Sequence, residues 1–196
     1  MTTHKHRIYL IRHGETEWTL SGQHTGTTDL SLTENGKNQA LLIKERLKNH
    51  PFAAVFCSPL ARARETCELA GLGKKAQIEP HLTEWNYGEY EGLTTAEIHK
   101  TNPQWNIFKN GGPHGESPEA VEVRVKQMIA LFQTVSGDVA VVSHGHFLRA
   151  LATIWIGLPI EKGTLFALAP ASLSILGFER EQHVIRLWNE TTHATH

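Results

Sequence analysis

The sequence of 196 residues is poor in cysteine and contains no apolar run long enough to cross a membrane. Its two cysteines, Cys57 and Cys67, build neither a disulfide framework nor a zinc site of paired thiols, which favours a reducing compartment. The N-terminal residues also lack the apolar region of a secretory signal, because Arg7 and Arg12 enclose only four apolar residues. We therefore expect a cytoplasmic protein with no membrane partner.

The sequence also lacks an excess of charge of either sign. The 19 Lys and Arg residues against 20 Asp and Glu give a formal net charge of -1, so no global basic field attracts nucleic acid. The 13 histidines are scattered, and we interpret those near the ends as polar tails and not as a metal-binding tract: His4, His6, His193 and His196. We expect no metal and no nucleic-acid partner, and an anionic ligand must be bound by local groups.

Short apolar runs rich in β-branched residues predict the strands. Most of these runs are continuous, which favours strands covered on both faces in a mainly parallel sheet. The last two strands are expected to form a hairpin. The predicted strands cover residues 8–11, 53–57, 139–143, 172–178 and 184–188, with a weaker one near Gln77.

Start and stop signals predict helices between these strands. The helices begin at Thr33, Ser58-Pro59, Ser117-Pro118 and about His146. Strands that alternate with helices predict an α/β fold, a three-layer α/β/α sandwich. The helix after Ser117 is expected to pack on the sheet through residues at helical spacing, namely Val121, Val125, Met128 and Phe132.

No internal repeat and no linker divides the chain, so we expect a single domain over residues 1–196. Residues 88–115 are its irregular part, because they hold Pro103 and the run Gly111-Gly112-Pro113 and only a short helical piece at 95–100. We interpret this segment as an insertion over the functional site.

Cationic and nucleophilic residues follow three of the predicted strands. Arg12-His13 follows the first, Arg62 lies in the helical turn after the second, and His144-Gly145-His146 follows strand 139–143. The carboxyl ends of parallel strands meet at one edge of a sheet, where ligands bind. Arginine forks and the free N–H groups of the helix starts at Ser58 and His146 suit a phosphate, and Gly14 and Gly145 allow close approach of the backbone.

A surface role is the alternative for these cations. Arg12 and Arg62 could instead pair with Glu15, Glu17 or Glu65, and this is the interpretation that we adopt for Arg46 and Arg64.

Several motifs follow one another in an order typical of one family. They are 12–18 (RHGETEW), 25–26 (TG) with 29–33 (DLSLT), 58–63 (SPLARA), Glu84 with 87–88 (YG), and 143–145 (SHG). On these motifs the chain resembles the histidine phosphatase superfamily, also called the phosphoglycerate mutase-like family, over nearly its whole length. The resemblance implies a phosphoglycerate mutase-like fold and a phosphoric monoester hydrolase.

The same resemblance implies the catalytic roles. His13 is the nucleophile that takes the phosphoryl group, and Arg12, Arg62 and His144 surround the phosphate. Glu84, in the pattern Glu-x-x-x-Gly that ends at Gly88, donates a proton to the leaving oxygen and can then activate water. A neutral imidazole attacks phosphorus in line, while arginines and a protonated histidine supply the positive charge that other enzymes obtain from a metal. We therefore expect no cofactor.

The acid role of Glu84 needs a protonated carboxyl group beside the phosphate. Burial against Trp85 or Tyr87, together with the charge of the ligand, is expected to favour that form. Glu89 and Glu91 are competing candidates for the acid, and only the spacing to Gly88 favours Glu84.

Further sequence similarities within the family indicate the class of substrate. The segments 21–26 (SGQHTG), 84–88 (EWNYG), 105–107 (WNI) and 144–149 (HGHFLR) look like the sedoheptulose-1,7-bisphosphatase type of fungi, which implies a sugar phosphate substrate. Besides the catalytic residues, the expected substrate-binding residues are Gln23, Thr25, Gly26, Trp85, Asn86, Tyr87, Gly145, His146 and Arg149. Arg149 either binds a second anionic group or is an exposed helical arginine, and the aromatic side chains of Trp85, Tyr87 and Trp105 either line the sugar or belong to the core.

Two alternatives to a small-molecule phosphatase stay open. One is a phosphoglycerate mutase, although mutases of this family tend to be longer. The other is a catalytically idle phosphoprotein-binding module, which is expected to lose one of the five catalytic residue types that are all present here. A homodimer is possible, but the sequence does not decide the oligomeric state.

Overall fold

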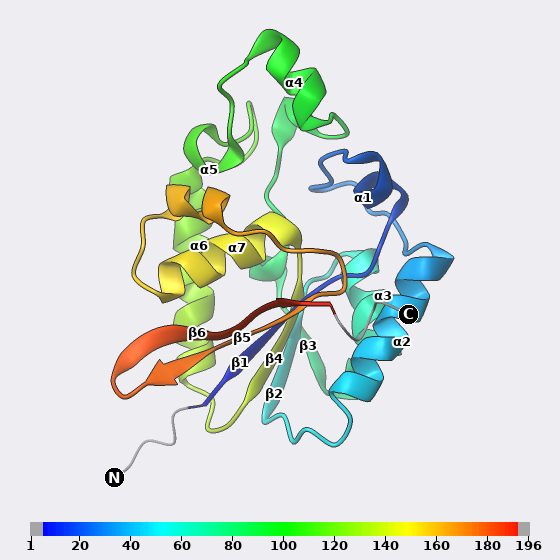
Figure 1. Cartoon of the computed structure of the whole chain (residues 1–196), viewed down its shortest axis with the longest axis vertical. Helices are drawn as coiled ribbons and strands as arrows, with labels where there is room; N and C mark the ends of the chain where they lie inside the picture. Colours follow the sequence, from blue (N-terminus) through cyan, green and yellow to red (C-terminus); the bar gives the residue numbers. More distant parts are fainter. Residues whose placement is uncertain (1–5, 192–196) are drawn as a thin grey trace.

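The computed structural model describes residues 6–191, so His4, His193 and His196 lie outside the described residues. Six strands form one sheet in the order β3-β2-β4-β1-β5-β6 (Figure 1). Their bounds are β1 Ile8–Arg12, β2 Ala54–Cys57, β3 Ala76–Ile78, β4 Val139–Ser143, β5 Leu173–Glu179 and β6 Gln182–Glu190.

The first four strands are parallel, and their carboxyl ends share one edge. β1 and β2 both pair with β4 in parallel, and β3 pairs with β2 in the same sense. β5 runs antiparallel to β1 and forms a hairpin with β6. The mainly parallel sheet and the final hairpin are therefore confirmed.

Helices connect the strands on both faces. They are α1 Glu17–Ser21, α2 Glu34–Arg46, α3 Ala61–Leu69, α4 Thr95–Thr101, α5 Ile107–Asn110, α6 Pro118–Gln133 and α7 Gly145–Trp155. Short 3-10 helices are η1 Gly73–Lys75, η2 Pro80–Leu82, η3 Gly88–Tyr90 and η4 Ile160–Leu165. The side chains of Thr33 and Ser117 cap α2 and α6, as their sequence signals predicted.

The predicted start of the second helix at Ser58 is wrong. α3 begins at Ala61, and the side chain of Ser58 caps nothing there. The N–H of Ala61 instead donates to Asp29 Oδ1 at 2.6 Å, a carboxylate from a distant loop. A cap that comes from 32 residues away cannot be predicted from local sequence, and it leaves Ser58 for another role.

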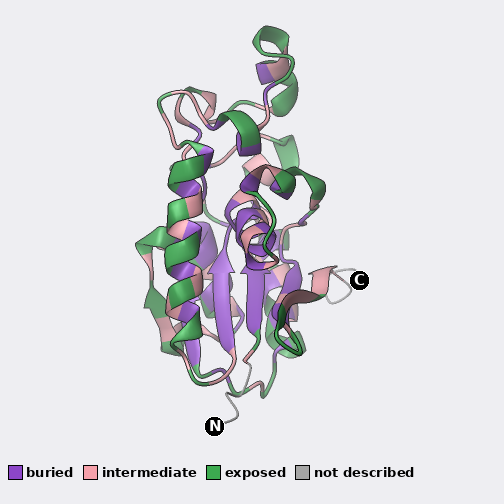
Figure 2. Ribbon diagram, turned by 90° about the vertical axis from the view of Figure 1, so that its left-hand side faces the viewer, coloured by how far each residue is buried: buried purple, intermediate pink, exposed green. Residues whose placement is uncertain are grey.

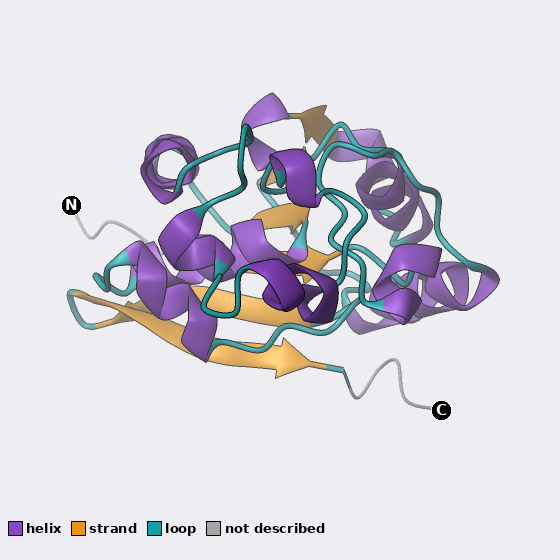
Figure 3. Cartoon of the chain, turned by 90° about the horizontal axis from the view of Figure 1, so that it is seen from above, coloured by secondary structure: helices purple, strands orange, loops and turns teal. Residues whose placement is uncertain are grey.

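The three layers follow from the alternation of the strand side chains. Ile8 and Leu10 of β1 pack with α6 and α7, whereas Tyr9 and Ile11 pack with α2 and α3. Figure 3 shows these helices on the two sides of the sheet, and Figure 2 shows buried central strands beneath helices with exposed outer faces. The residues of α6 that were predicted to face the sheet are at most 1% exposed: Val121, Val125, Met128 and Phe132.

Residues 88–115 lie at the end of the molecule beyond the carboxyl ends of the parallel strands (Figure 1). They hold η3, the predicted short helix α4, and α5, whose Ile107 and Phe108 are buried in the core that α6 and α7 share. No helix between residues 6 and 191 is long and apolar enough to span a membrane.

Candidate active site

A cavity of about 190 Å³ opens at the carboxyl edge of the parallel strands. Nine residues that the sequence predicted line it: Arg12, His13, Gln23, Thr25, Glu84, Tyr87, Gly145, His146 and Arg149. Five further lining residues were missed, namely Trp18, Thr19, Gly22, His24 and Leu168. His24 lies inside the segment 21–26 that carried the finer likeness, so a signal for it existed; Leu168, in an irregular segment, had none.

His13 follows β1 directly and is almost completely buried. Its backbone N–H donates to the carbonyl of Ser143 at 3.0 Å, and its Nδ1 lies 2.8 Å from the carbonyl oxygen of Gly14. A carbonyl only accepts, so Nδ1 carries the proton and Nε2 keeps its lone pair. Burial, and then the charges of Arg12 and Arg62, hold the pKa of His13 well below 6.5. The imidazole is therefore neutral at pH 7, with Nε2 available as a nucleophile.

Arg12, the last residue of β1, lines the cavity beside His13. Its Nη1 donates to the carbonyl of Leu168, but its buried Nε has no hydrogen-bond partner among the described residues. A Cβ at position 145 would come within 3.2 Å of the guanidinium carbon, so Gly145 lets the start of α7 lie against this arginine. Arg12 thus brings a positive charge to the cavity.

The other two predicted phosphate ligands lie behind the cavity and not in its lining. Arg62 is fully buried, and its guanidinium donates to the carbonyls of Thr25, Gly26 and Thr28 at 2.9 to 3.0 Å. Its Nε donates to Nδ1 of His144 at 3.2 Å. That these two residues bind the phosphate directly stays a prediction.

His144 is neutral in this structure, which corrects the expectation of a protonated histidine. Nδ1 accepts from Arg62, which can only donate, so Nε2 carries the proton and donates to Ser58 Oγ at 2.7 Å. Burial and the nearby cations, Arg62 first among them, lower the pKa of His144 well below 6.5. Its ring lies 5.2 Å from that of His13, so it forms a neutral wall behind the nucleophile.

The hydroxyl of Ser58 fixes the orientation of the His144 ring through this hydrogen bond, and its replacement by alanine tests that role. We expect Ser58→Ala to lower the free energy of unfolding by about 1–3 kcal/mol, because the N–H of His144 loses its acceptor. We expect kcat/KM to fall about tenfold as the imidazole loses its fixed orientation. Urea unfolding and steady-state phosphate release measure the two effects.

Thr153→Val is the matched control, since it removes a buried hydroxyl that donates to the carbonyl of Arg149 away from His144. Equal kcat/KM in the two variants would contradict the role of Ser58.

Glu84 lies in the irregular segment between η2 and η3, and both of its carboxylate oxygens accept backbone hydrogen bonds. Oε1 accepts from Trp85 and Phe147, each at 2.9 Å, and Oε2 accepts from His146 at 3.0 Å. The side chain is buried as expected, and three backbone N–H groups fix the position of its carboxyl group.

These bonds also correct the expectation of a free N–H group at His146, because protein carboxylates accept several N–H groups at the two helix starts. Glu84 accepts the N–H groups of His146 and Phe147, the second and third residues of α7, and Asp29 accepts the N–H of Ala61, the first residue of α3. Gly14 likewise serves packing, because a Cβ there would lie 2.5 Å from the carbonyl oxygen of Gly36.

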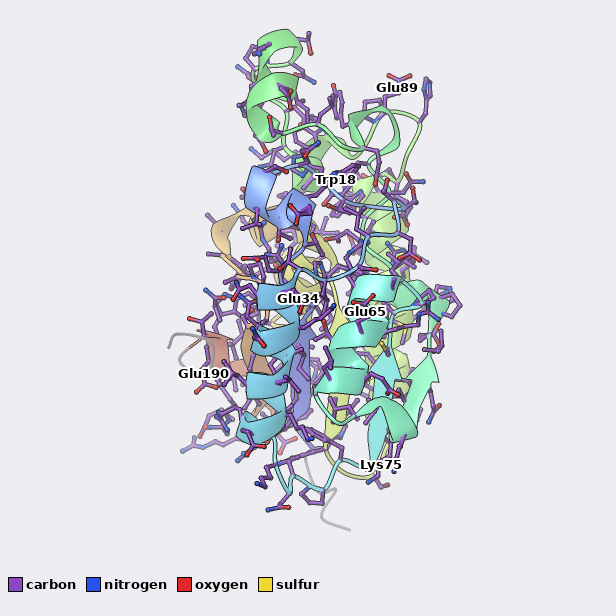
Figure 4. The ribbon with its side chains drawn as sticks, turned by 90° about the vertical axis from the view of Figure 1, so that its right-hand side faces the viewer. Trp18, Glu34, Glu65, Lys75, Glu89 and Glu190 are labelled. Carbon is purple, nitrogen blue, oxygen red and sulfur yellow. The ribbon has the colours of Figure 1, made fainter. Side chains whose placement is uncertain are left out.

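The competing acids lie elsewhere. Glu89 pairs with His114 at 2.7 Å and is labelled at the outer end of the molecule in Figure 4. Glu91 holds a loop by accepting the N–H groups of Gly26 and Thr28. Of the three carboxylates, only Glu84 lines the cavity.

The structure also shows which arginines form surface ion pairs. Arg46 forms an ion pair with Glu190 at 3.0 Å, as expected for a surface arginine. Glu15 accepts from Thr33 and Asn35, and the hydrogen bonds of Arg62 go to carbonyls and a histidine.

Aromatic and imidazole rings and one arginine form another part of the cavity wall. The hydroxyl oxygen of Tyr87 and Nδ1 of His146 are hydrogen-bonded at 2.5 Å, and burial raises the pKa of Tyr87 well above 10 while it lowers that of His146. His24 stacks on Tyr87 at 4.8 Å between ring centres, and burial lowers its pKa to about 4. Arg149 lies over the ring of Phe108 and donates to the carbonyl of Gly163. It is therefore a partly buried residue of the cavity and not an exposed helical arginine.

Three residues predicted to bind substrate have structural contacts outside the lining. Trp85 is fully buried and its Nε1 donates to the carbonyl of Glu116. Asn86 accepts the N–H of Gly88, and Gly26 lies against Glu91. Trp85 and the buried Trp105 thus belong to the core, while Tyr87 faces the cavity.

The segment 88–115 contributes no residue to the cavity lining. It holds the wall from outside, because Gln23 Nε2 donates to the carbonyl of Gly92 and the N–H of His24 donates to that of Leu93. Between residues 6 and 191, no group of three or more His, Cys, Asp or Glu side chains is placed to hold a metal ion.

Comparisons with known proteins agree with this arrangement. The family model of the histidine phosphatase superfamily (branch 1) matches residues 8–191. An acid phosphatase of Mycobacterium tuberculosis is 41% identical over 197 residues, which cover 98% of this chain and 97% of that protein. Sedoheptulose 1,7-bisphosphatase of Saccharomyces cerevisiae is 36% identical over 189 residues, which cover 80% of this chain and 69% of that protein.

A solved structure of an open reading frame product from Mycobacterium tuberculosis has the same fold. Its TM-score is 0.90 at 41% sequence identity, with 94% of this chain and 97% of that chain covered. The α/β fold with its six-stranded sheet is thus the phosphoglycerate mutase-like fold. The chain belongs to branch 1 of the histidine phosphatase superfamily, and it is a phosphatase.

Proposed function

We propose that the protein hydrolyses a small phosphorylated metabolite, a sugar phosphate or bisphosphate, through a phosphohistidine on His13. The observation that carries the proposal is the convergence of three groups on one cavity. These are the neutral His13 with a free Nε2, the cationic Arg12, and Glu84. Positioning and electrostatics supply most of phosphoryl-transfer catalysis, and these groups supply both.

The reaction then has two steps. Nε2 of His13 attacks phosphorus, the bond from phosphorus to the ester oxygen breaks, and Glu84 gives that oxygen a proton. The Glu84 carboxylate next takes a proton from water, which attacks the phosphohistidine and releases phosphate. The backbone N–H groups of His146 and Phe147 hold the carboxyl group of Glu84 in place while it gives up and takes back the proton.

The substrate class rests on the size and lining of the cavity and on the relatives. A volume of about 190 Å³ suits a small ester, and the uncharged wall of Tyr87, His146 and His24 suits a neutral sugar body. Arg149 adds a cation for a second anionic group. The sedoheptulose 1,7-bisphosphatase among the relatives supports the same class.

A phosphate-release assay tests the proposal directly. Sugar bisphosphates, sugar monophosphates, phosphoglycerates and nucleotides are compared in the presence of EDTA, and we expect turnover of sugar phosphates that the chelator does not reduce. Interconversion of phosphoglycerates that outruns phosphate release would instead identify a mutase. Tight binding of phosphopeptides without turnover of any ester would identify a binding module.

Arg149→Gln tests the second anion site. We expect KM for a sugar bisphosphate to rise about tenfold or more, because a charge-assisted hydrogen bond is lost, while KM for the monophosphate stays unchanged. The matched control is Lys162→Gln, which removes an exposed cation from η4 next to Gly163. Equal effects of Arg149→Gln on both esters would contradict this role.

A further inference from the structure

The segment that carries Glu84 has no regular backbone hydrogen bonds of its own. Residues 83–87 lie between η2 and η3 outside any helix or strand. An acid that protonates a leaving oxygen must be held within hydrogen-bond reach of it, and small displacements reduce the rate strongly. Other parts of the chain must therefore fix this segment.

Arg124 of α6 holds the segment on one side. Its Nη1 donates to the carbonyls of His81 and Thr83 at 2.6 and 3.1 Å, and its Nη2 donates to the carbonyl of Glu84 itself at 3.4 Å. Nε and Nη2 also donate to the two carboxylate oxygens of Glu116 at 2.7 and 2.9 Å. All five N–H groups of the guanidinium are thus used.

Glu116 holds the other side of the acid. Its Oε2 accepts the N–H of Asn86 at 2.9 Å, and its own backbone N–H donates to the carbonyl of Asn86 at 2.9 Å. Its carbonyl also accepts from Nε1 of Trp85 at 2.9 Å. The ion pair between Glu116 and Arg124 therefore joins the backbone before Glu84 to the backbone after it.

The same pair reaches the helix that holds the carboxylate. The guanidinium of Arg124 lies 4.8 Å from the ring centre of Phe147, and the N–H of Phe147 is one of the three donors to Glu84. The side chain of Arg124 is only 13% exposed, so water screens these contacts weakly. Both the main chain of Glu84 and a donor to its carboxylate thus depend on one guanidinium.

We infer that Arg124 and Glu116 are positioning residues for the proton-donating Glu84. They touch neither the cavity nor the reacting atoms, and they act by fixing where the carboxyl group lies. This inference rests on the proposed function, in which Glu84 protonates the leaving oxygen.

The dependence of the rate on the leaving group separates this role from a merely structural one. Nitrophenolate departs from p-nitrophenyl phosphate without a proton, whereas the alkoxide of glycerol 2-phosphate needs one. Loss of a positioned acid therefore lowers kcat/KM for the glycerol ester selectively, while partial misfolding lowers it equally for both esters.

The experiment compares kcat/KM for the two esters in Glu84→Gln, Arg124→Lys, Arg124→Met and Glu116→Gln. For Glu84→Gln we expect a loss on the glycerol ester about a hundredfold larger than on the aryl ester. For the Arg124 and Glu116 variants we expect a selective loss of about tenfold, and no further selective loss when Arg124→Lys is added to Glu84→Gln. Lys126→Met breaks the exposed ion pair with Glu122 on the same helix. We expect this control to leave the ratio of kcat/KM for the glycerol ester to kcat/KM for the aryl ester unchanged.

Two results would overturn the inference. Equal losses on both esters in the Arg124 and Glu116 variants, with the selective loss still present in Glu84→Gln, would make the pair structural and leave the proposed function intact. No selective loss in Glu84→Gln would refute Glu84 as the acid, and the positioning role with it. Arg124→Lys keeps the charge, and circular dichroism confirms that the protein assayed is folded.

Discussion

Replacement of His13 by alanine is expected to lower kcat/KM by at least about 1,000-fold on every phosphate ester the enzyme accepts. The reason is that Nε2 of His13 is the atom that forms the bond to phosphorus, and the neighbouring His144 cannot replace it. Both ring nitrogens of His144 are engaged, one by Arg62 and the other by Ser58. Phosphate release under saturating and limiting substrate measures the loss.

The matched control is His114→Ala, because His114 is exposed and forms its ion pair with Glu89 at the outer end of the molecule. We expect this variant to keep the full rate. Retained turnover in His13→Ala, with the protein shown to be folded, would contradict a nucleophilic role.

Replacement of Arg62 by methionine is expected to reduce both stability and activity. The substitution removes the hydrogen-bond donor of four acceptors around the buried guanidinium. They are the carbonyls of Thr25, Gly26 and Thr28 and Nδ1 of His144. At about 1–3 kcal/mol for each unsatisfied group, the free energy of unfolding should fall by at least about 3 kcal/mol. Urea unfolding measures this change.

Arg62→Lys separates charge from geometry. An ammonium group keeps the charge but cannot span the carbonyls of one loop and His144 together, so we expect kcat/KM to fall about a hundredfold. Arg64→Met on the exposed face of the same helix is the control and should change neither quantity. If Arg62→Lys kept both wild-type stability and wild-type kcat/KM, the fork of hydrogen bonds would have no role in the site.

Local sequence patterns predicted those parts of the fold that depend on local physics. The strands β1 and β4 are continuous apolar runs, and the caps at Thr33 and Ser117 bond to residues three positions away, so both can be read from short segments. The convergence of Arg12 and His13 with His144 followed from the parallel order of their strands. Helices α1 and α5 were missed, because four or five residues carry too little periodicity to be recognised.

The polar network around the site could not be predicted, because long-range contacts decide it. Asp29 caps α3 across 32 residues and so leaves Ser58 free to accept from His144 across 86. In the same way, Arg124 and Glu116 contact Glu84 and its neighbours across 30 to 43 positions. No spacing in the sequence distinguishes these side chains from ordinary surface charges.

The covalent intermediate is the central claim, and trapping it is the most direct test. The enzyme is mixed with a radiolabelled sugar phosphate, quenched in alkali within milliseconds and digested, and the labelled peptide is sequenced by mass spectrometry. We predict an acid-labile, alkali-stable phosphohistidine on His13, with no labelled peptide in His13→Ala. Turnover without any labelled peptide, or a label on another residue, would contradict the account.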